Sequence, residues 1–329
     1  MASRMDTRER WGKRNMPDTM RSVRQHAYGG PEVLRVDEVP RPTPRDGQVL
    51  VRVHAASVNP IDWKLRTGIL RELFPQTLPA GVGEDFAGVV EQAAGDTGFK
   101  PGDAVYGMLP SSQTGAFAEY VVIDAGSLAP QPAGIGHERS AAVPMGALTA
   151  WQGIVGQGGL KAGMRVLVHG AAGNVGGMAV QIARALGAEV TAAASADALS
   201  RVPALGAGRT VPYADNVPAG VEPGSQDIVF DTLGGPIQEA SWPLLKHGGI
   251  LVTTLGIADP SRAAQSGVRA SGFGAVPDGN QLRQVAAMVE AGQVKVVVGR
   301  TLPLAEAGQA QELNRTGKVK GKVVVVVPG

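Results

Sequence analysis

The sequence lacks cysteine, and this absence removes several kinds of chemistry at once. Disulfides, thiolate nucleophiles and cysteine-ligated zinc all need the thiol, so none of them operates in this chain of 329 residues. Aromatic residues are scarce, at 4%, too few for the stacking platforms that bind single-stranded nucleic acids. No window approaches the roughly 18 apolar residues of a membrane-spanning helix. We therefore expect no membrane as a partner.

A strong charge of one sign is missing as well. The 31 basic and 29 acidic residues leave a net charge of +2. No stripe of Lys and Arg follows residue 25, so no nucleic acid is expected as a partner. No apolar segment near the start resembles a signal peptide, and we expect a cytoplasmic protein. Residues 1–20 mix Arg with Asp and Glu; we expect a disordered tail there, with a functional basic arm as the alternative.

Two domains are expected from the length and from a change of pattern along the chain. Apolar residues make up 43% of the sequence, which suffices for packed cores. Residues 21–143 contain short alternating runs, such as Val49, Val51 and Val53, separated by proline and glycine turns. This pattern predicts a small β-barrel.

After residue 141, apolar strands alternate with helix-period segments. This alternation predicts an α/β fold with a doubly wound parallel sheet. We expect strands at 166–169, 189–193, 228–231 and 250–255, and helices at 178–186, 198–205, 236–245 and 280–291. Two further strands, at 294–298 and 322–327, can return to the first domain and make it discontinuous.

A glycine-rich turn at 170–176 is the most informative motif. It reads Gly-Ala-Ala-Gly-Asn-Val-Gly between an apolar run and an amphipathic helix. Glycine at a strand-to-helix turn lets the backbone approach a pyrophosphate closely, and the helix start offers N–H groups to it. In this context the motif predicts a dinucleotide site, with a purely structural turn as the alternative.

Several longer motifs, in order along the chain, resemble one family. They are VLVRVHAASVNPIDWKLRTG at 49–68, GEDFAGVV at 83–90, FKPGDAVYG at 99–107, GAFAEYVV at 115–122, AAVPMGALTAW at 141–151 and GKVKGKVVVVV at 317–327. The chain resembles the medium-chain dehydrogenase/reductase superfamily, in its zinc-free quinone oxidoreductase (ζ-crystallin-like) branch. The resemblance implies a GroES-like β-barrel domain, 21–143 plus 277–329, and a Rossmann domain, 144–276. It also implies a homodimer through sheet edges around 250–273.

The departures from the zinc alcohol dehydrogenases are equally useful. By the resemblance, those enzymes have a cysteine ligand where Asn59 stands, a histidine ligand at Glu84 and a second cysteine near Met145. One carboxylate cannot replace three ligands of this kind. The five histidines have no metal-like spacing and are expected in surface or capping roles. We predict that no metal is bound.

The resemblance assigns the cofactor site residue by residue. The residues expected to wrap the pyrophosphate are Ala171, Gly173, Asn174, Val175 and Gly176. The residues expected near the nicotinamide are Asn59, Thr149, Leu233, Leu255, Gly256 and Phe273. The last four follow strand ends or form a covering loop, and strand carboxyl ends are where ligands bind in such sheets. Asp231 is interpreted as a residue that closes its strand.

The cofactor is expected to be NADPH rather than NADH. The second strand of the sheet ends at Ala194 and Ser195 without the acid that would hold a ribose 2′-OH. Tyr213 matches a tyrosine that contacts the 2′-phosphate in similar reductases, with simple packing as the alternative. Asp197 would repel a phosphate, and Arg201, one helical turn further on, could compensate.

Without a metal or thiol, the simplest chemistry is direct hydride transfer to a quinone or α,β-unsaturated carbonyl. Asn59 and Lys64 are the catalytic candidates, because a donor must stabilise the oxygen that becomes negative. Trp63 and Phe273 are expected to line the substrate pocket, whereas surface exposure for Lys64 and core packing for Trp63 are the alternatives. Asp62 is expected to order its loop through Arg66.

Two other functions fit the same motifs. One is an enoyl reductase of a biosynthetic pathway, which would differ only in the pocket. The other is a redox-inactive NADPH-binding protein, because a fold alone does not fix a function.

Overall fold

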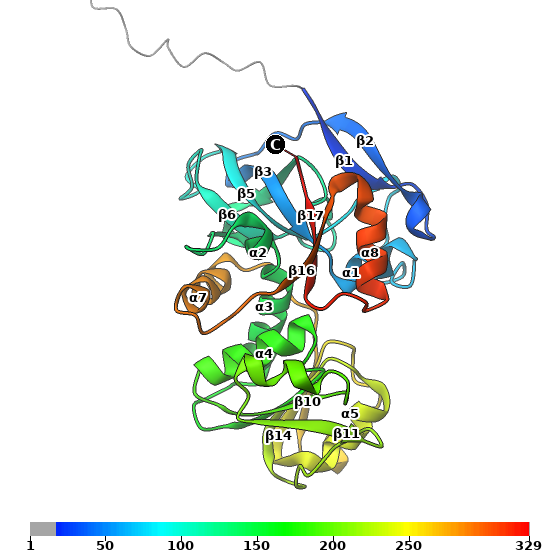
Figure 1. Ribbon diagram of the computed structural model, residues 1–329, viewed down its shortest axis with the longest axis vertical. Coiled ribbons are helices and arrows are strands. Elements are labelled where there is room, and N and C mark those ends of the chain that lie inside the picture. The colour runs from blue at the N-terminus through cyan, green and yellow to red at the C-terminus, as the bar shows by residue number, and fades with distance from the viewer. Residues whose placement is uncertain (1–17, 329) are drawn as a thin grey trace, which may run out of the picture.

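The computed structural model describes residues 18–328. Figure 1 shows two lobes stacked along the long axis of the molecule. The upper lobe is rich in strands and combines the N-terminal part of the chain with its C-terminal end. The lower lobe is an α/β layer structure. Within residues 18–328, no helix is long and apolar enough to cross a bilayer.

The upper lobe contains two sheets. The smaller sheet has the order β2 (Leu34–Pro40), β1 (Thr19–Gln25), β4 (Ala80–Gly81). The larger has the order β16 (Val298–Pro303), β17 (Lys322–Val326), β3 (Gln48–Ser57), β5 (Asp85–Ala93), β6 (Ala104–Met108), β8 (Leu128–Pro130), and β7 (Tyr120–Asp124) also pairs with β3. The helices α1 (Pro60–Arg66), α2 (His137–Ala141) and α8 (Ala307–Arg315) belong to this lobe.

Strand β3 organises the upper lobe because its alternating valines fill the interior. Val49, Val51 and Val53 are at most 1% exposed. The C-terminal strand β17 pairs antiparallel with β3, with Val324 opposite Ser57. The strand expected at 294–298 was misplaced: β16 spans Val298–Pro303. A strand needs a partner, and the ladder to β17 begins only where Val298 lies opposite Lys322.

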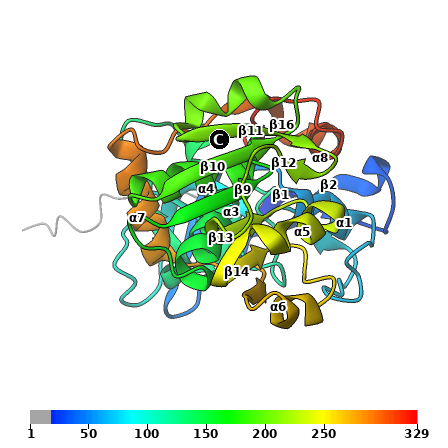
Figure 2. The same cartoon turned by 90° about the horizontal axis from the view of Figure 1, so that it is seen from below.

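The lower lobe is a doubly wound sheet, as predicted. Its order is β12 (Val217–Pro218), β11 (Arg209–Ala214), β10 (Glu189–Ala194), β9 (Arg165–His169), β13 (Gln226–Asp231), β14 (Leu245–Thr253), β15 (Arg269–Gly272), and only the β11–β12 pair is antiparallel. Figure 2 shows the central strands side by side. The sheet's connections change direction between β9 and β13, and ligands bind at the carboxyl ends of strands at such a switch point.

The helices of this lobe differ from expectation at two prolines. The α-helices on this sheet are α4 (Asn174–Ala185), α5 (Gly235–Ser241) and α6 (Ser261–Gln265), whereas α3 (Pro144–Trp151) lies between the lobes and α7 (Gly279–Glu290) packs beside β8 of the upper lobe. The helix expected at 198–205 is instead two short 3₁₀ turns, at Leu199–Arg201 and Pro203–Leu205. The helix expected at 236–245 ends at Ser241 before a 3₁₀ turn containing Pro243. Proline has no N–H for the helical ladder, which explains both interruptions.

One hydrophobic cluster spans the two lobes, and each lobe also has a cluster of its own. A single cluster of buried side chains includes Ala55 and Ala87 of the upper lobe and Val166 and Phe230 of the lower lobe. Helix α3 packs against β5 and β6 of the upper lobe and against α4 of the lower lobe. The lobes are therefore held together by packing as well as by chain connections. The boundaries at 143/144 and 276/277 stay predictions.

Candidate active site

The glycine turn joins β9 to α4 with a geometry that only glycine allows at two points. Gly170 has φ +67°, in the left-handed region that side chains disfavour. A Cβ on Gly176 would overlap the carbonyl oxygen of Gly170. No side chain caps α4 at Gly173, so the N–H groups of its first turn, including those of Asn174 and Val175, face outward for a ligand. These residues fit a dinucleotide pyrophosphate.

Ala171 plays a different part from its neighbours. Its side chain is fully buried, and its N–H donates to the Ala193 carbonyl at 3.0 Å. Because that donor is already used, Ala171 fastens the turn to β10 and has no amide to offer a pyrophosphate. The expectation that Ala171 lies along the pyrophosphate stays a prediction, without a donor role for its amide.

A hydrogen-bond network of Tyr213 and His169 contacts the glycine turn. The Tyr213 hydroxyl accepts a hydrogen bond from the Gly170 N–H at 3.1 Å and lies 3.1 Å from His169 Nδ1 and 3.3 Å from the Ala193 carbonyl. His169 Nε2 lies 2.9 Å from the Ser241 hydroxyl. Burial lowers the pKa of His169 to about 4, so its ring is neutral. Tyr213, expected at a 2′-phosphate, has its hydroxyl engaged under the turn, and His169 is a core residue and not a surface one.

The carboxyl ends of β13 and β14 present apolar side chains to solvent. Leu233 is 44% exposed and Leu255 is 50% exposed, and Gly256 follows with φ +83°. Asp231 closes β13 as interpreted: its carboxylate accepts hydrogen bonds from the Leu233 and Gly234 N–H groups at 2.9 and 3.0 Å. The Asp231 carboxylate thereby fixes the loop that exposes Leu233.

Three exposed polar residues follow the end of β10. They are Ser195, Asp197 and Arg201. A hydrogen bond from the Ser195 hydroxyl, chiefly, and the nearby charge of Arg201 lower the pKa of Asp197. The loop after this strand therefore carries a carboxylate with a guanidinium near it.

Two of the residues expected near the nicotinamide, Thr149 and Phe273, lie on α3 and against the hydrophobic cluster between the lobes. Thr149 is 6% exposed, and its hydroxyl donates to the Met145 carbonyl at 2.6 Å. A Cβ on Gly146, next along α3, would overlap the Asn174 side chain, so α3 lies directly against the glycine turn. Phe273 packs partly buried against the shared core, and its N–H donates to the Thr253 carbonyl at 3.1 Å.

Asn59 is the centre of a buried polar network. It is 1% exposed. Its Oδ1 accepts a hydrogen bond from Lys322 Nζ at 2.6 Å, and its Nδ2 donates to Asp85 Oδ2 at 2.8 Å. Lys322 Nζ also donates to the Val58 carbonyl at 3.0 Å and lies 3.7 Å from Asp85 Oδ2. The Lys322 ammonium, on β17, thus contacts the side-chain amide of Asn59, which follows β3.

Lys322 is a site residue that the sequence reasoning missed. Burial lowers its pKa, and the charge of Asp85 opposes that shift. Lys322 directly precedes the apolar run 323–327 in the sequence. A lysine in a buried strand needs a partner for its charge, and this position could have identified Lys322 as a candidate site residue.

Asp62 and Arg66 do not pair, contrary to expectation. Asp62 Oδ2 accepts the Asn59 N–H at 2.7 Å, as part of the capping box of α1. Arg66 instead donates to Gln311 Oε1 at 2.7 Å and pairs with Glu312, both on α8. Asp62 still orders its loop, but through the backbone of Asn59.

The structure places Lys64 and Trp63 side by side on α1. Both are partly exposed, and Lys64 Nζ lies 5.7 Å from the centroid of the Trp63 ring. Lys322, and not Lys64, contacts the Asn59 amide. The buried Trp63 Nε1 has no hydrogen-bond partner. The catalytic assignment of Lys64 stays a prediction.

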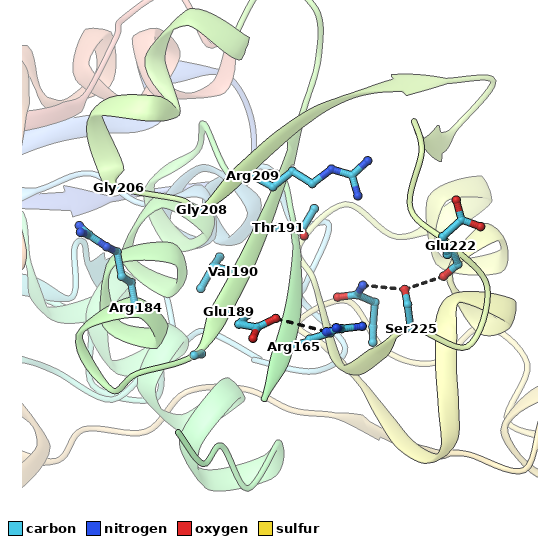
Figure 3. A pocket seen from close by; sticks show the side chains of 12 residues that line it. Arg165, Arg184, Glu189, Val190, Thr191, Gly206, Gly208, Arg209, Glu222 and Ser225 are labelled. Atoms are coloured by element: carbon cyan, nitrogen blue, oxygen red, sulfur yellow. Dashed lines mark hydrogen bonds and ion pairs between the residues drawn. The ribbon is translucent and has the colours of Figure 1, made fainter. Parts of the chain in front are cut away.

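A groove of about 560 Å³ lies elsewhere, at the amino ends of β9, β10, β11 and β13. Figure 3 shows its charged lining, in which Arg165 pairs with Glu189 at 3.2 Å. Arg209 Nη2 donates to the Gly220 carbonyl at 2.6 Å. Because the glycine turn follows the carboxyl end of β9, this groove is at the opposite edge of the sheet and is not the cofactor site.

Comparisons with known proteins agree with this geometry. A model of the alcohol dehydrogenase GroES-like domain matches residues 45–133, and one of a zinc-binding dehydrogenase matches 205–325. The chain is 33% identical to the mitochondrial NAD(P)H oxidoreductase RTN4IP1 of Bos taurus, over 91% of this chain and 87% of that protein. It is 32% identical to the quinone oxidoreductase of Homo sapiens, over 89% and 93%. The solved structure of the quinone oxidoreductase from Coxiella burnetii has a TM-score of 0.85 and 31% identity, and the match covers 94% of this chain and 100% of that one.

A dinucleotide turn on a doubly wound sheet, joined to a GroES-like barrel, defines an oxidoreductase that uses a nicotinamide cofactor. The chain belongs to the medium-chain dehydrogenase/reductase superfamily, in its quinone oxidoreductase branch. It is an enzyme of the quinone oxidoreductase type.

Proposed function

We propose that this enzyme reduces quinones or α,β-unsaturated carbonyls by direct hydride transfer from NADPH, without zinc. The observation that carries the proposal is the Lys322 ammonium at 2.6 Å from Asn59 Oδ1. The Lys322 ammonium already occupies Asn59 Oδ1, the oxygen of the side chain that replaces a zinc ligand, and Asn59 offers neither the imidazole nitrogen nor the thiolate of a usual zinc ligand. Among residues 18–328, no group of three or more His, Cys, Asp or Glu side chains could hold a metal ion.

The bound nicotinamide supplies the hydride, and the protein's part is to hold it and to polarise the acceptor. The first turn of α4 holds the pyrophosphate, and the exposed Leu233 and Leu255 offer an apolar surface for the nicotinamide end. The Lys322 ammonium fixes the Asn59 amide and is itself balanced by Asp85 Oδ2 at 3.7 Å, so this ion pair adds no net charge to the site.

NADPH is proposed as the preferred form on the basis of the β10 tip. Ala193, Ala194 and Ser195 leave that tip without an acid, and Arg201 supplies a charge that suits a phosphate. Asp197 opposes this preference, so its replacement is the sharpest test of it. We also propose a homodimer through β15, which has no neighbouring strand on its outer side within residues 18–328.

The test is oxidation of NADPH and NADH after EDTA treatment, with 1,4-benzoquinone and a simple enone as acceptors. Turnover that survives EDTA and favours NADPH is expected. Activity that is lost with EDTA and restored by zinc would refute zinc independence. Cofactor binding without turnover on either acceptor would instead indicate an enoyl reductase with a narrow substrate or a redox-inactive binding protein.

A further inference from the structure

Two glutamines of one short π-helix bind the segment that follows β15. The π-helix spans Gln152–Gln157 and directly continues α3. At its start, Gln152 Oε1 accepts the Val276 N–H at 3.0 Å, and Gln152 Nε2 donates to the Val276 carbonyl at 2.8 Å. At its end, Gln157 Oε1 accepts the Ser271 hydroxyl at 2.8 Å. The 271–276 segment is therefore hydrogen-bonded to the π-helix at both of its ends.

The bonds to Val276 fix the orientation of the Gln152 amide. A backbone N–H can only donate and a backbone carbonyl can only accept, so Oε1 must face the first and Nε2 the second. Nε2 also donates to Gln281 Oε1, on α7, at 2.9 Å. Both N–H groups of the Gln152 amide are thus used, and this one side chain bonds Val276 as a neighbouring strand would.

The π-helix brings the two glutamines to one face. In an α-helix, residues five apart point about 140° away from one another, because 3.6 residues make a turn. In a π-helix the hydrogen bond itself joins residues five apart, and here the Gly158 N–H reaches the Gly153 carbonyl at 2.8 Å. Gln152 and Gln157 are five apart and therefore lie one turn from each other. Turns of this kind are rare and occur frequently at functional sites.

The π-helix packs tightly on the sheet. A Cβ on Gly153 would overlap the ring of Phe230, on β13, so only glycine allows this close approach. Ile154 is fully buried in the hydrophobic cluster that spans the lobes. The glutamines therefore project from a packed element and bind a segment that is outside helix and strand after Gly272.

The 271–276 segment lies at the edge of the sheet where a dinucleotide binds. Strands β9, β13, β14 and β15 are parallel, so this segment and the glycine turn follow carboxyl ends at the same edge. The Phe273 N–H donates to the Thr253 carbonyl at 3.1 Å, and a Cβ on Gly272 would lie 3.1 Å from the Gly256 Cα. The segment therefore lies against the loop that exposes Leu255.

The strand order indicates which half of the dinucleotide this edge would meet. A dinucleotide extends to both sides of its pyrophosphate across the switch point, and its adenosine ribose is recognised at the end of the second strand. That strand is β10, on one side of β9, whereas β13, β14 and β15 are on the other. The 271–276 segment is therefore on the side of the nicotinamide half.

We propose that Gln152 and Gln157 are positioning residues that hold the 271–276 segment as a preformed wall at the nicotinamide end, with Phe273 as the side chain they place. The proposal rests on the proposed function, because the wall acts on the ring that donates the hydride. Each glutamine acts through the segment and not by contact with the cofactor. A wall that is already ordered holds the ring and the acceptor in reacting geometry at a lower entropic cost.

The first experiment uses the cofactor-free protein. Amide hydrogen exchange, measured by mass spectrometry on peptides covering 271–278, should be faster in Gln152→Met than in the wild type. Methionine has no N–H to donate and accepts only weakly, so the Val276 N–H loses its protection. Gln265→Met is the matched control, because Gln265 is an exposed glutamine on α6 that donates to the Ser261 hydroxyl at 3.1 Å. Equal exchange in the wild type and Gln152→Met would overturn the proposal.

The second experiment follows the bound cofactor. The reduced nicotinamide ring is fluorescent, and its emission reports how firmly the protein holds the ring away from water. NADPH and NADH are both titrated, so the result does not depend on which form is preferred. In Gln152→Met the emission per bound molecule should fall and kcat should fall about tenfold. The dissociation constant should change little, because the first turn of α4 still binds the pyrophosphate. Wild-type emission and kcat in this variant would contradict a positioning role.

The bond between Gln157 and Ser271 is tested from both sides. Gln157→Met and Ser271→Ala remove the same hydrogen bond, and each should lower kcat about threefold. The double variant should be no slower than the slower single variant, because the shared bond is lost only once. Single variants with wild-type kcat, or effects that multiply in the double variant, would refute the role of this bond. These variants also carry the test if Gln152→Met does not fold, which a melting curve without cofactor shows.

The outcomes separate this proposal from the proposed function. A wild type that reduces no acceptor would refute the function and the positioning role with it, and hydrogen exchange would still decide whether Gln152 holds the segment. An active wild type and an equally active Gln152→Met would overturn the positioning role alone. A lower melting temperature or a changed oligomeric state in that equally active variant would show that the glutamine serves the fold or the sheet edge instead.

Discussion

The buried Asp62 makes a definite prediction about stability against pH. Its pKa is about 7 in the folded protein and 3.8 when unperturbed. The folded state thus binds this proton more tightly than the unfolded state does. The contribution of Asp62 is therefore least unfavourable below the unfolded pKa, and stability is lost as the pH rises toward 7.

The size of the effect follows from the shift. A difference of about three pKa units corresponds to about 4 kcal/mol once both states are ionised. Between pH 5 and pH 8, Asp62 should lower the free energy of unfolding by about 2–3 kcal/mol. In Asp62→Asn this pH-dependent decrease should vanish, because asparagine does not titrate. Its side-chain oxygen can still accept the Asn59 N–H that Asp62 binds at 2.7 Å, so the cap of α1 is kept.

The assay is urea unfolding at several pH values, followed by the fluorescence of the chain's four tryptophans. The free energy of unfolding should fall with pH more steeply in the wild type than in Asp62→Asn. Equal slopes for the two proteins would show that Asp62 is ionised in both states, and the reasoning from burial would fail.

Three further predictions concern the cofactor turn, the strand tip and the buried ammonium. Gly176→Ala should weaken NADPH binding by about 1–3 kcal/mol, because its Cβ would overlap the Gly170 oxygen; unchanged affinity in a fluorescence titration would contradict the tight turn. Asp197→Arg should tighten NADPH relative to NADH about tenfold by replacing a repulsive charge, and an unchanged ratio of the two dissociation constants would remove this position from cofactor choice. Lys322→Met should lower the free energy of unfolding by about 3–5 kcal/mol, since it leaves Asp85 buried without its cation. Lys64→Met is the control for stability, and a large loss of its turnover would in addition support Lys64 as a catalytic group.

Local patterns predicted the parts of the fold that depend on local chemistry. The alternating valines of β3 and the glycine turn before α4 are determined by neighbours in sequence. The helices expected around Pro203 and Pro243 failed because the apolar period was followed past a residue that cannot donate. The strand expected at 294–298 failed because its position depends on β17, which is distant in sequence.

The sequence motifs predicted Asn59 and the glycine turn as site residues, but they did not predict Lys322. Asn59 and the glycine turn were identified by motifs, but the partner of Asn59 lies 263 residues away. Lys64 was proposed from the resemblance of its segment, and that assignment stays a prediction, whereas the cation that contacts Asn59 is Lys322. Tyr213 was assigned by analogy to a phosphate, and only its contacts with Gly170 and His169 show that its hydroxyl is occupied.

The return of β17 to β3 also constrains how the protein is made. Lys322 bonds a carbonyl 264 residues earlier, and at roughly 5–20 residues per second a ribosome needs about 10–50 s to cover that distance. During this interval β3 has an open edge where β17 will pair, and Asp85 has no ammonium. The barrel can therefore complete its charge balance only when the last strand leaves the ribosome, and a nascent chain that stalls earlier would present an unpaired strand to chaperones and proteases.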